Sequence, residues 1–185
     1  VFGGAYSMYD GLHFGEVIDI PEVEEWRMGN GDWRYYEGNS LKLDGNAYWK
    51  NTVALGKNLH AFADVQVRNV DYTTNGTDND LRTYDVDFQE LFFNPKGGVT
   101  FSNGKHKAYA SVAYAGKEPN RNDFVDAIDP SKVRSEFMLN TEVGYGLTFE
   151  KFSVRLNAYS MEYNDQLVLT GCLLYTSDAA DDLLC

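Results

Sequence analysis

The sequence predicts an all-β fold: an antiparallel up-and-down sheet of about seven long strands that forms a fragment of a transmembrane β-barrel. Apolar and polar residues alternate with a period of two along much of the chain, whereas helical periodicity is almost absent. Many expected strands are longer than the roughly five or six residues that are usual in globular proteins. Their connections alternate between tight turns and long loops, as in outer-membrane barrels, where only one end faces a large polar space.

An opening strand is expected over about residues 1–9, followed at 42–55 and 59–72 by the two strands of a hairpin. In both strands of this hairpin the odd-numbered positions are mostly apolar and the even-numbered positions mostly polar, with Phe62 as an exception. Gly56-Lys57-Asn58, between the two strands, supplies the residue types that hairpin turns require.

Two further hairpins repeat this plan. Their strands are expected at 88–101, 106–114, 136–149 and 152–168, with short turns at 102–105 and 150–151. If such a sheet lies in a membrane, one apolar face contacts lipid and the polar face lines a wet lumen. The side chains expected to point outward to lipid include Leu43, Val53, Val65, Val67, Val143, Leu147, Val154 and Leu156.

Long loops are expected at about 10–41, 73–87 and 116–135. Structureless loops of this length inside a compact soluble domain would argue against the strand assignment. Aromatic residues gather beside the short turns, namely Phe101, Phe149 and Phe152. Such rings suit the girdle at a membrane interface, although they could also close the end of a soluble hydrophobic core.

Composition excludes several classes of protein. The chain has 16 Lys and Arg against 28 Asp and Glu, a net charge of −12, which argues against a nucleic-acid partner. Aromatic residues make up 15% of the chain, which argues against a disordered acidic tail. No apolar run is long enough for a membrane-spanning helix. We find no spacing typical of a nucleophilic triad, a phosphate loop or a metal site, so we expect no enzymatic activity, no cofactor and no metal.

The last fourteen residues, 172–185, do not continue the preceding pattern. The run from Cys172 to Asp182 resembles the translation of a sequencing-library transposase adapter. We therefore interpret 172–185 as a non-native tail and 1–171 as the natural domain, with the gene expected to continue beyond Gly171. Both cysteines, Cys172 and Cys185, lie in this tail, so their even number does not indicate a disulfide bond.

Four motifs with a fixed order and spacing suggest a family. They are 92–98 (FFNPKGG), 118–123 (EPNRND), 135–136 with 142–145 (SE and EVGY), and 159–168 (YSMEYNDQLV). Together they resemble the C-terminal part of the barrel of TonB-dependent outer-membrane receptors, over about residues 1–171.

This resemblance implies a barrel of about 22 strands around an N-terminal plug, in the outer membrane of a Gram-negative bacterium. Such receptors take up a scarce, bulky nutrient: iron–siderophore complexes, cobalamin, haem or oligosaccharides. The implied partners are outer-membrane lipid, the missing plug domain and remaining strands, the TonB energy-coupling complex and an unidentified small molecule. The fragment alone is not expected to transport or to insert stably, because open sheet edges in lipid leave backbone groups without hydrogen bonds.

The first candidate ligand-binding residues are Glu118, Arg121 and Asp123, at the start of a long loop. They could line the upper lumen and contact the plug or the ligand, since Arg recognises carboxylates through two hydrogen bonds. The alternative is a salt-bridged loop base that only sets geometry. Closely spaced oxygens at 77–80 could attract Ca²⁺, but the central Gly of an EF-hand is absent.

The second group of candidates is aromatic and lies in the expected loop at 10–41: Trp26, Trp33, Tyr35 and Tyr36. These rings could stack on sugars or on a macrocycle, or they could form a small core within the loop. They also support the main alternative function, a soluble all-β carbohydrate-binding module, which would be a two-layer sandwich around one apolar core. A porin-like or fatty-acid-type barrel without energy coupling is a third possibility.

Overall fold

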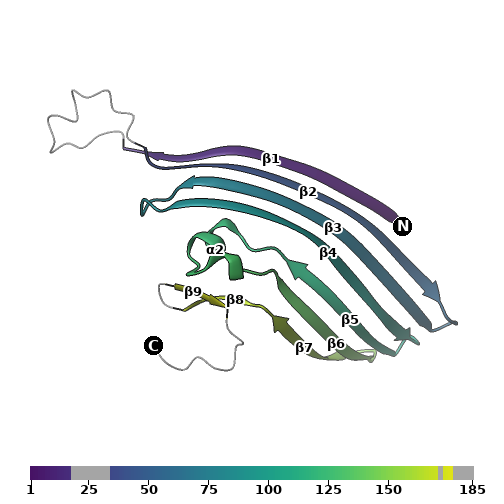
Figure 1. The fold of residues 1–185 in the computed structure, drawn as a ribbon. Helices are drawn as coiled ribbons and strands as arrows, with labels where there is room; N and C mark the ends of the chain where they lie inside the picture. Colours follow the sequence, from purple (N-terminus) through teal and green to yellow (C-terminus); the bar gives the residue numbers. More distant parts are fainter. Residues whose placement is uncertain (18–33, 171–172, 177–185) are drawn as a thin grey trace, which may run out of the picture. The chain divides into compact units, whose positions relative to one another are not determined.

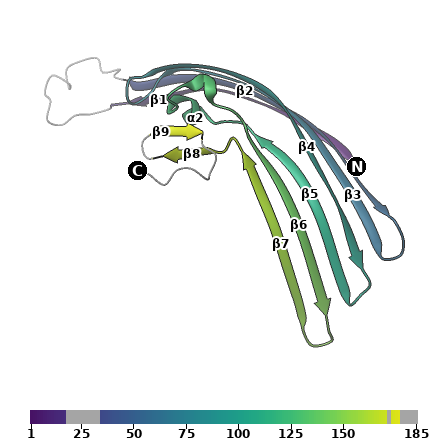
Figure 2. The same cartoon turned by 60° about the horizontal axis from the view of Figure 1, so that its bottom comes forward.

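The computed structural model describes residues 1–17, 34–170 and 173–176. It is all-β, and seven antiparallel strands form one sheet, as predicted. Each strand lies beside the strand that follows it in sequence, in both views of the molecule (Figure 1 and Figure 2). The strands are β1 (Phe2–Glu16), β2 (Arg34–Ala54), β3 (Leu59–Thr77), β4 (Thr83–Ser102), β5 (His106–Lys117), β6 (Glu136–Thr148) and β7 (Ser153–Asn164).

The sheet has two edges, β1 and β7, so the described strands do not close into a barrel. A separate two-stranded sheet pairs β8 (Leu167–Thr170) with β9 (Leu173–Thr176). Between β5 and β6 lie a short helix, α2 (Arg121–Val125), and a 3-10 turn, η1 (Pro130–Lys132). Among the described residues, no helix has the length and apolar character needed to cross a membrane.

The three predicted tight turns are confirmed. Each is closed by a backbone hydrogen bond of 2.8–3.0 Å, from Leu55 to Leu59, from Asn103 to His106 and from Phe149 to Phe152. In the second turn Gly104 has a φ of 88°, a left-handed conformation that glycine adopts without steric cost. The amide of His106 also donates to Oδ1 of Asn103 at 2.9 Å, so this Asn-Gly turn is held from both sides.

The predicted bounds of the long loops are wrong at two of the three places. β1 continues to Glu16 and β2 already begins at Arg34, so much of the expected loop at 10–41 is strand, while 18–33 lies outside the described residues. β3 continues to Thr77 and β4 begins at Thr83, so the loop expected at 73–87 is reduced to a short turn. Backbone pairing does not require apolar side chains, so these strands continue where the alternating pattern fades. The third expected loop, 116–135, does connect two strands.

The pairing of residues between neighbouring strands, from β4 to β7, shows which side chains share a face of the sheet. Directly paired residues point to the same side. One row across four strands is Val99, Ala110, Val143 and Ala158, and the next is Phe101, Ala108, Tyr145 and Leu156. A third row, His106, Leu147 and Val154, follows toward the turns. We call the side of the sheet that carries these rows the apolar face.

The apolar face is not covered by another layer in the described part of the chain. Of the eight side chains predicted to point outward, Val53, Val67, Val143, Val154 and Leu156 are exposed, and Leu43, Val65 and Leu147 are partly exposed. Leu156, for example, is 69% exposed. The buried apolar side chains among the described residues are Val70, Val86, Phe92 and Phe124.

The chain divides into two compact units, and the smaller one consists of Tyr6–Asp44 and Val70–Glu90. Its interior is partly polar. Thr74 is 0% exposed; its hydroxyl group lies 2.7 Å from the hydroxyl of Ser40 and donates to the backbone oxygen of Asn39 at 3.0 Å. Val70 is buried in the same unit. These hydrogen bonds compensate for removing two hydroxyl groups from water.

The turn between β3 and β4 contains a strained residue. The amide of Leu81 donates to the backbone oxygen of Asp78 at 3.0 Å. The amide of Asp78 donates to the backbone oxygen of Arg82 at 2.9 Å. Leu81 therefore occupies the left-handed position of a three-residue hairpin loop, with a φ of 62°. This position usually belongs to glycine, because a Cβ atom there costs about 1–2 kcal/mol.

Leu81→Gly is expected to stabilise this hairpin by about 0.5–1 kcal/mol. Relief of the strain outweighs the entropy cost of glycine, about 0.5–1 kcal/mol, and little packing is lost because Leu81 is 75% exposed. Hydrogen exchange at the amides of Asp78 and Leu81 would slow about two- to fivefold. Leu91→Gly, at an exposed strand position without a positive φ, is the control and should slow neither amide; equal slowing in both variants would contradict the strain.

Candidate functional site

The opposite side of the sheet, which we call the polar face, carries three rows of paired residues on β5, β6 and β7. The row nearest the turns is Lys107, Gly146 and Arg155, the next is Tyr109, Gly144 and Asn157, and the third is Ser111, Glu142 and Tyr159. In the first two rows the central strand contributes a glycine. The side chains of β5 and β7 therefore approach each other with no side chain between them.

A hydrogen-bonded cluster occupies the second and third rows. The hydroxyl group of Tyr109 donates to Oε1 of Glu142 at 2.5 Å and lies 2.8 Å from Oδ1 of Asn157. The amide nitrogen of Asn157 donates to the same Glu142 oxygen at 3.0 Å. The carboxylate of Glu142 is thus bound by neutral donors from both neighbouring strands. The Tyr109 ring lies directly over Gly144, where a Cβ atom would collide with it.

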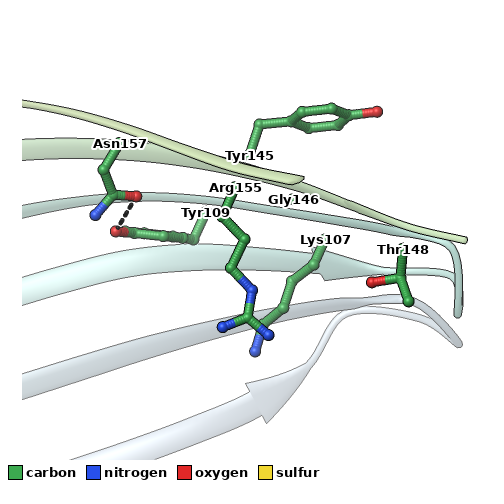
Figure 3. A pocket seen from close by; sticks show the side chains of 7 residues that line it. All are labelled: Lys107, Tyr109, Tyr145, Gly146, Thr148, Arg155 and Asn157. Atoms are coloured by element: carbon green, nitrogen blue, oxygen red, sulfur yellow. Dashed lines mark hydrogen bonds between the residues drawn. The ribbon is translucent and has the colours of Figure 1, made fainter. Parts of the chain in front are cut away.

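The first row borders an open hollow of about 330 Å³. It is lined by Lys107, Tyr109, Tyr145, Gly146, Thr148, Arg155 and Asn157 (Figure 3). The side chains of Lys107 and Arg155 extend to the same side of the sheet, whereas the ring of Tyr145 points to the other side (Figure 3). Two cationic side chains from different strands therefore share one space on the polar face.

A second hollow, of about 400 Å³, is lined by residues of β2 to β5. The ammonium group of Lys50 lies 3.2 Å from the carboxylate of Asp64, and the amide of Asn94 donates to the side-chain oxygen of Gln66 at 3.2 Å. The side-chain oxygen of Asn94 also accepts a hydrogen bond of 2.9 Å from the amide of Gly116. Most of the polar groups that line this second hollow therefore bind one another.

Glu118, one of the predicted binding residues, is engaged within the protein. Two nitrogen atoms of the Arg68 guanidinium donate to its two carboxylate oxygens at 2.8 and 2.9 Å. This bidentate pair lies above the ring of Phe92, whose centre is 6.0 Å from Cζ of Arg68. Phe92 is 1% exposed, and its ring centre is 6.2 Å from that of Phe137. The pair therefore anchors the end of β5 to β3, which is the geometric role weighed as the alternative.

Asp123 and Arg121, the other two candidates of this group, belong to α2. The carboxylate of Asp123 accepts a hydrogen bond of 2.7 Å from the amide of Asn120, whose own side chain caps the amides of Asn122 and Asp123. Asp123 thus completes a capping box at the start of the helix. Arg121 is partly exposed. A ligand-binding role of these three residues stays a prediction.

The aromatic candidates are divided by the structure. Tyr35 and Tyr36 lie on β2, not in a loop, and their rings meet edge to face with centres 5.0 Å apart. Both rings approach Gly15 of β1, whose lack of a side chain makes room for them. Trp26 and Trp33 lie outside the described residues. A platform made of all four rings stays a prediction.

The oxygens at 77–80 serve the hairpin turn. Oδ1 of Asp78 accepts hydrogen bonds from the amides of Asp80 and Arg82, and Oδ2 accepts one from Nε of Arg82, at 2.8–2.9 Å. Burial would raise the pKa of Asp78, but the hydrogen bonds from Arg82 and Asp80 outweigh it and lower this pKa below its ordinary value. Within the described part of the chain, no group of three His, Cys, Asp or Glu residues could hold a metal ion.

The cluster around Glu142 and the cation pair were not found from the sequence. Alternation places Arg155 and Asn157 on a polar face, but only the register shows that they lie opposite Tyr109 and Lys107 across β6. One feature of the sequence could have indicated them: two glycines, Gly144 and Gly146, stand at successive polar-face positions of one strand and leave room for side chains of its neighbours.

No family model matches the chain, and neither a curated protein nor a solved structure gives a match. The resemblance of its motifs to TonB-dependent receptors thus stays a prediction.

Gly144→Val is expected to lower the free energy of unfolding by about 1–3 kcal/mol, because the new side chain displaces the Tyr109 ring from Glu142. The double variant Tyr109→Ala/Gly144→Val should recover part of this loss. Gly146→Val is the matched control: a Cβ atom there lies 3.5 Å from Cγ of Arg155, an ordinary contact. Denaturant unfolding followed by circular dichroism in detergent micelles gives these values. Equal destabilisation by the two valines would contradict the packing of Tyr109 on Gly144.

Proposed function

We propose that this chain is part of the wall of an outer-membrane β-barrel, and that the whole protein is an energy-coupled receptor of the TonB-dependent kind. Its role is uptake of a scarce, bulky nutrient across the outer membrane of a Gram-negative bacterium. The observation that carries this proposal is a single sheet whose two faces differ in chemistry while its apolar face stays uncovered.

The apolar face needs a non-aqueous environment. Burying a Val or Leu side chain is worth roughly 1.5–3 kcal/mol, and Val112, Val143, Val154 and Leu156 are all exposed on this face. Soluble monomers rarely leave such a contiguous apolar surface in water. Hydrocarbon chains of lipid would cover it without any further protein layer.

The length of the apolar stretch supports the same environment. On β7 and its preceding turn the apolar face runs through Phe152, Val154, Leu156 and Ala158, and turns polar at Ser160 and Glu162. Counted from Phe152 to the first polar residue on this face, Ser160, the segment has nine residues, the lower end of the roughly 9–11 that a tilted membrane strand needs.

Aromatic side chains mark the end of this stretch at the turns. The rings of Phe149 and Phe152 stack with centres 4.4 Å apart and are both exposed. On the neighbouring strands, the hydroxyl of Tyr145 lies 2.6 Å from Nδ1 of His106. Rings with a polar partner suit the boundary between hydrocarbon and head groups, where one end is apolar and the other wet.

The alternative of a soluble carbohydrate-binding module requires two packed layers around one core. The seven strands described here form one sheet, and few apolar side chains are buried, so this alternative lacks its core in that part of the chain. A barrel without energy coupling would share the same wall. Only the four motifs of the resemblance favour the receptor over it, and a plug domain encoded upstream would separate the two.

Site-directed spin labelling of the full chain in detergent micelles tests the wall. In a Cys172→Ser/Cys185→Ser background, single cysteines replace neighbours that point to opposite faces at the same depth: Val112 with Ser111, and Val154 with Ser153. Labels at Val112 and Val154 are expected to collide mainly with oxygen, which dissolves in hydrocarbon. Labels at Ser111 and Ser153 should collide mainly with a water-soluble nickel complex.

The paired design controls for depth and for local mobility. Equal accessibility within each pair, or a cooperative soluble monomer in the absence of detergent, would reject the membrane wall.

A further inference from the structure

We propose that the hollow between Lys107 and Arg155 binds a tetrahedral dianion of the phosphate class. The two cations come from β5 and β7, in one row, and Gly146 between them leaves the space above β6 open. Adjacent strands are about 4.8 Å apart, so the backbones of the two cationic residues are separated by roughly 10 Å. Their long side chains can span this gap and place both charges on one anion.

No acid within the described part of the chain neutralises this pair. Neither Lys107 nor Arg155 has an ion-pair partner among the described residues. The nearest carboxylate along the polar face of β6 is Glu142, four residues from Gly146 and therefore about 13 Å along the strand. It is bound by Tyr109 and Asn157 instead. In a chain with a net charge of −12, two cations without such a partner form a local positive site.

The donors fit an oxyanion. Arg155 offers a planar fork that can bind two oxygens, and Lys107 offers a compact point charge. Thr148, on β6 and lining the same hollow, adds a hydroxyl donor. Donors on three strands thus surround one space, and a doubly charged phosphate balances the two cations. Free phosphate and a phosphate ester on a lipid share this chemistry, and the polar face favours the soluble form.

Titration of the full chain with inorganic phosphate in uncharged maltoside micelles tests this site. Binding is followed by the NMR shifts of the Arg155 Nε–H group and of the Lys107 side chain. We expect saturable binding that weakens with added sodium chloride. Lys107→Gln and Arg155→Gln should each weaken it at least fivefold. Gly146→Val should weaken it as strongly without changing charge, because the valine fills the gap between the cations.

Lys57→Gln removes the same charge at another tight turn and should change the affinity less than twofold. Circular dichroism measures the sheet content and so checks that each variant is folded. If a variant does not fold, the titration of the unmodified chain alone decides whether phosphate binds. Absence of saturable binding, or equal loss in Lys57→Gln, would overturn the site. A second titration uses micelles doped with a phosphate-monoester lysolipid. If this lipid shifts the NMR signal of the Arg155 Nε–H group and free phosphate does not, the assignment to a soluble anion is overturned.

Discussion

Cross-strand register is the constraint on which the other features of this chain depend. Side chains alternate between the two faces of a strand, so a slip of one residue would exchange the faces. The observed pairing puts Val99, Ala110, Val143 and Ala158 in one row. It places Lys107, Glu142 and Arg155 on the other side of the same sheet. A sheet sorted in this way has one face that water does not solvate well. In the described part of the chain no second layer covers that face.

The polar face is organised by contacts between strands, several of which pair a ring with a glycine. The rings of Tyr48, Phe62 and Tyr109 lie where the Cβ atoms of Gly3, Gly98 and Gly144 would be, each on another strand. Such pairs fill the space that glycine leaves and help to fix the register. They also explain Phe62, the aromatic residue that interrupts the polar side of its strand. The ion pairs Arg68–Glu118 and Lys50–Asp64 link further strands.

The sequence was sufficient for the all-β class, the seven up-and-down strands of the main sheet and the three tight turns, because apolar alternation and turn residues are local signals. It was insufficient where pairing continues through polar segments, as at Arg34–Leu41 and Thr73–Thr77, since backbone hydrogen bonds leave no compositional trace. Glu118 was predicted to contact the plug or a ligand, with a salt-bridged loop base as the alternative. The partner that the structure gives it, Arg68, is 50 residues away in sequence, so the pattern of residues could not name it. The cluster around Glu142 and the row of Lys107 and Arg155 required the register, which the sequence alone does not fix.

The central claim is that the apolar face contacts hydrocarbon. Its most direct measurement is a nuclear Overhauser experiment on the methyl-labelled full chain in micelles, which detects contact with the acyl chains of the detergent. Methyl groups of Val112, Val143, Leu147, Val154 and Leu156 should show cross-peaks to acyl protons, while those of Ala113 and Thr148 on the polar face should show cross-peaks to water. Cross-peaks between methyls of the apolar face and a second protein layer, without acyl contacts, would contradict the claim.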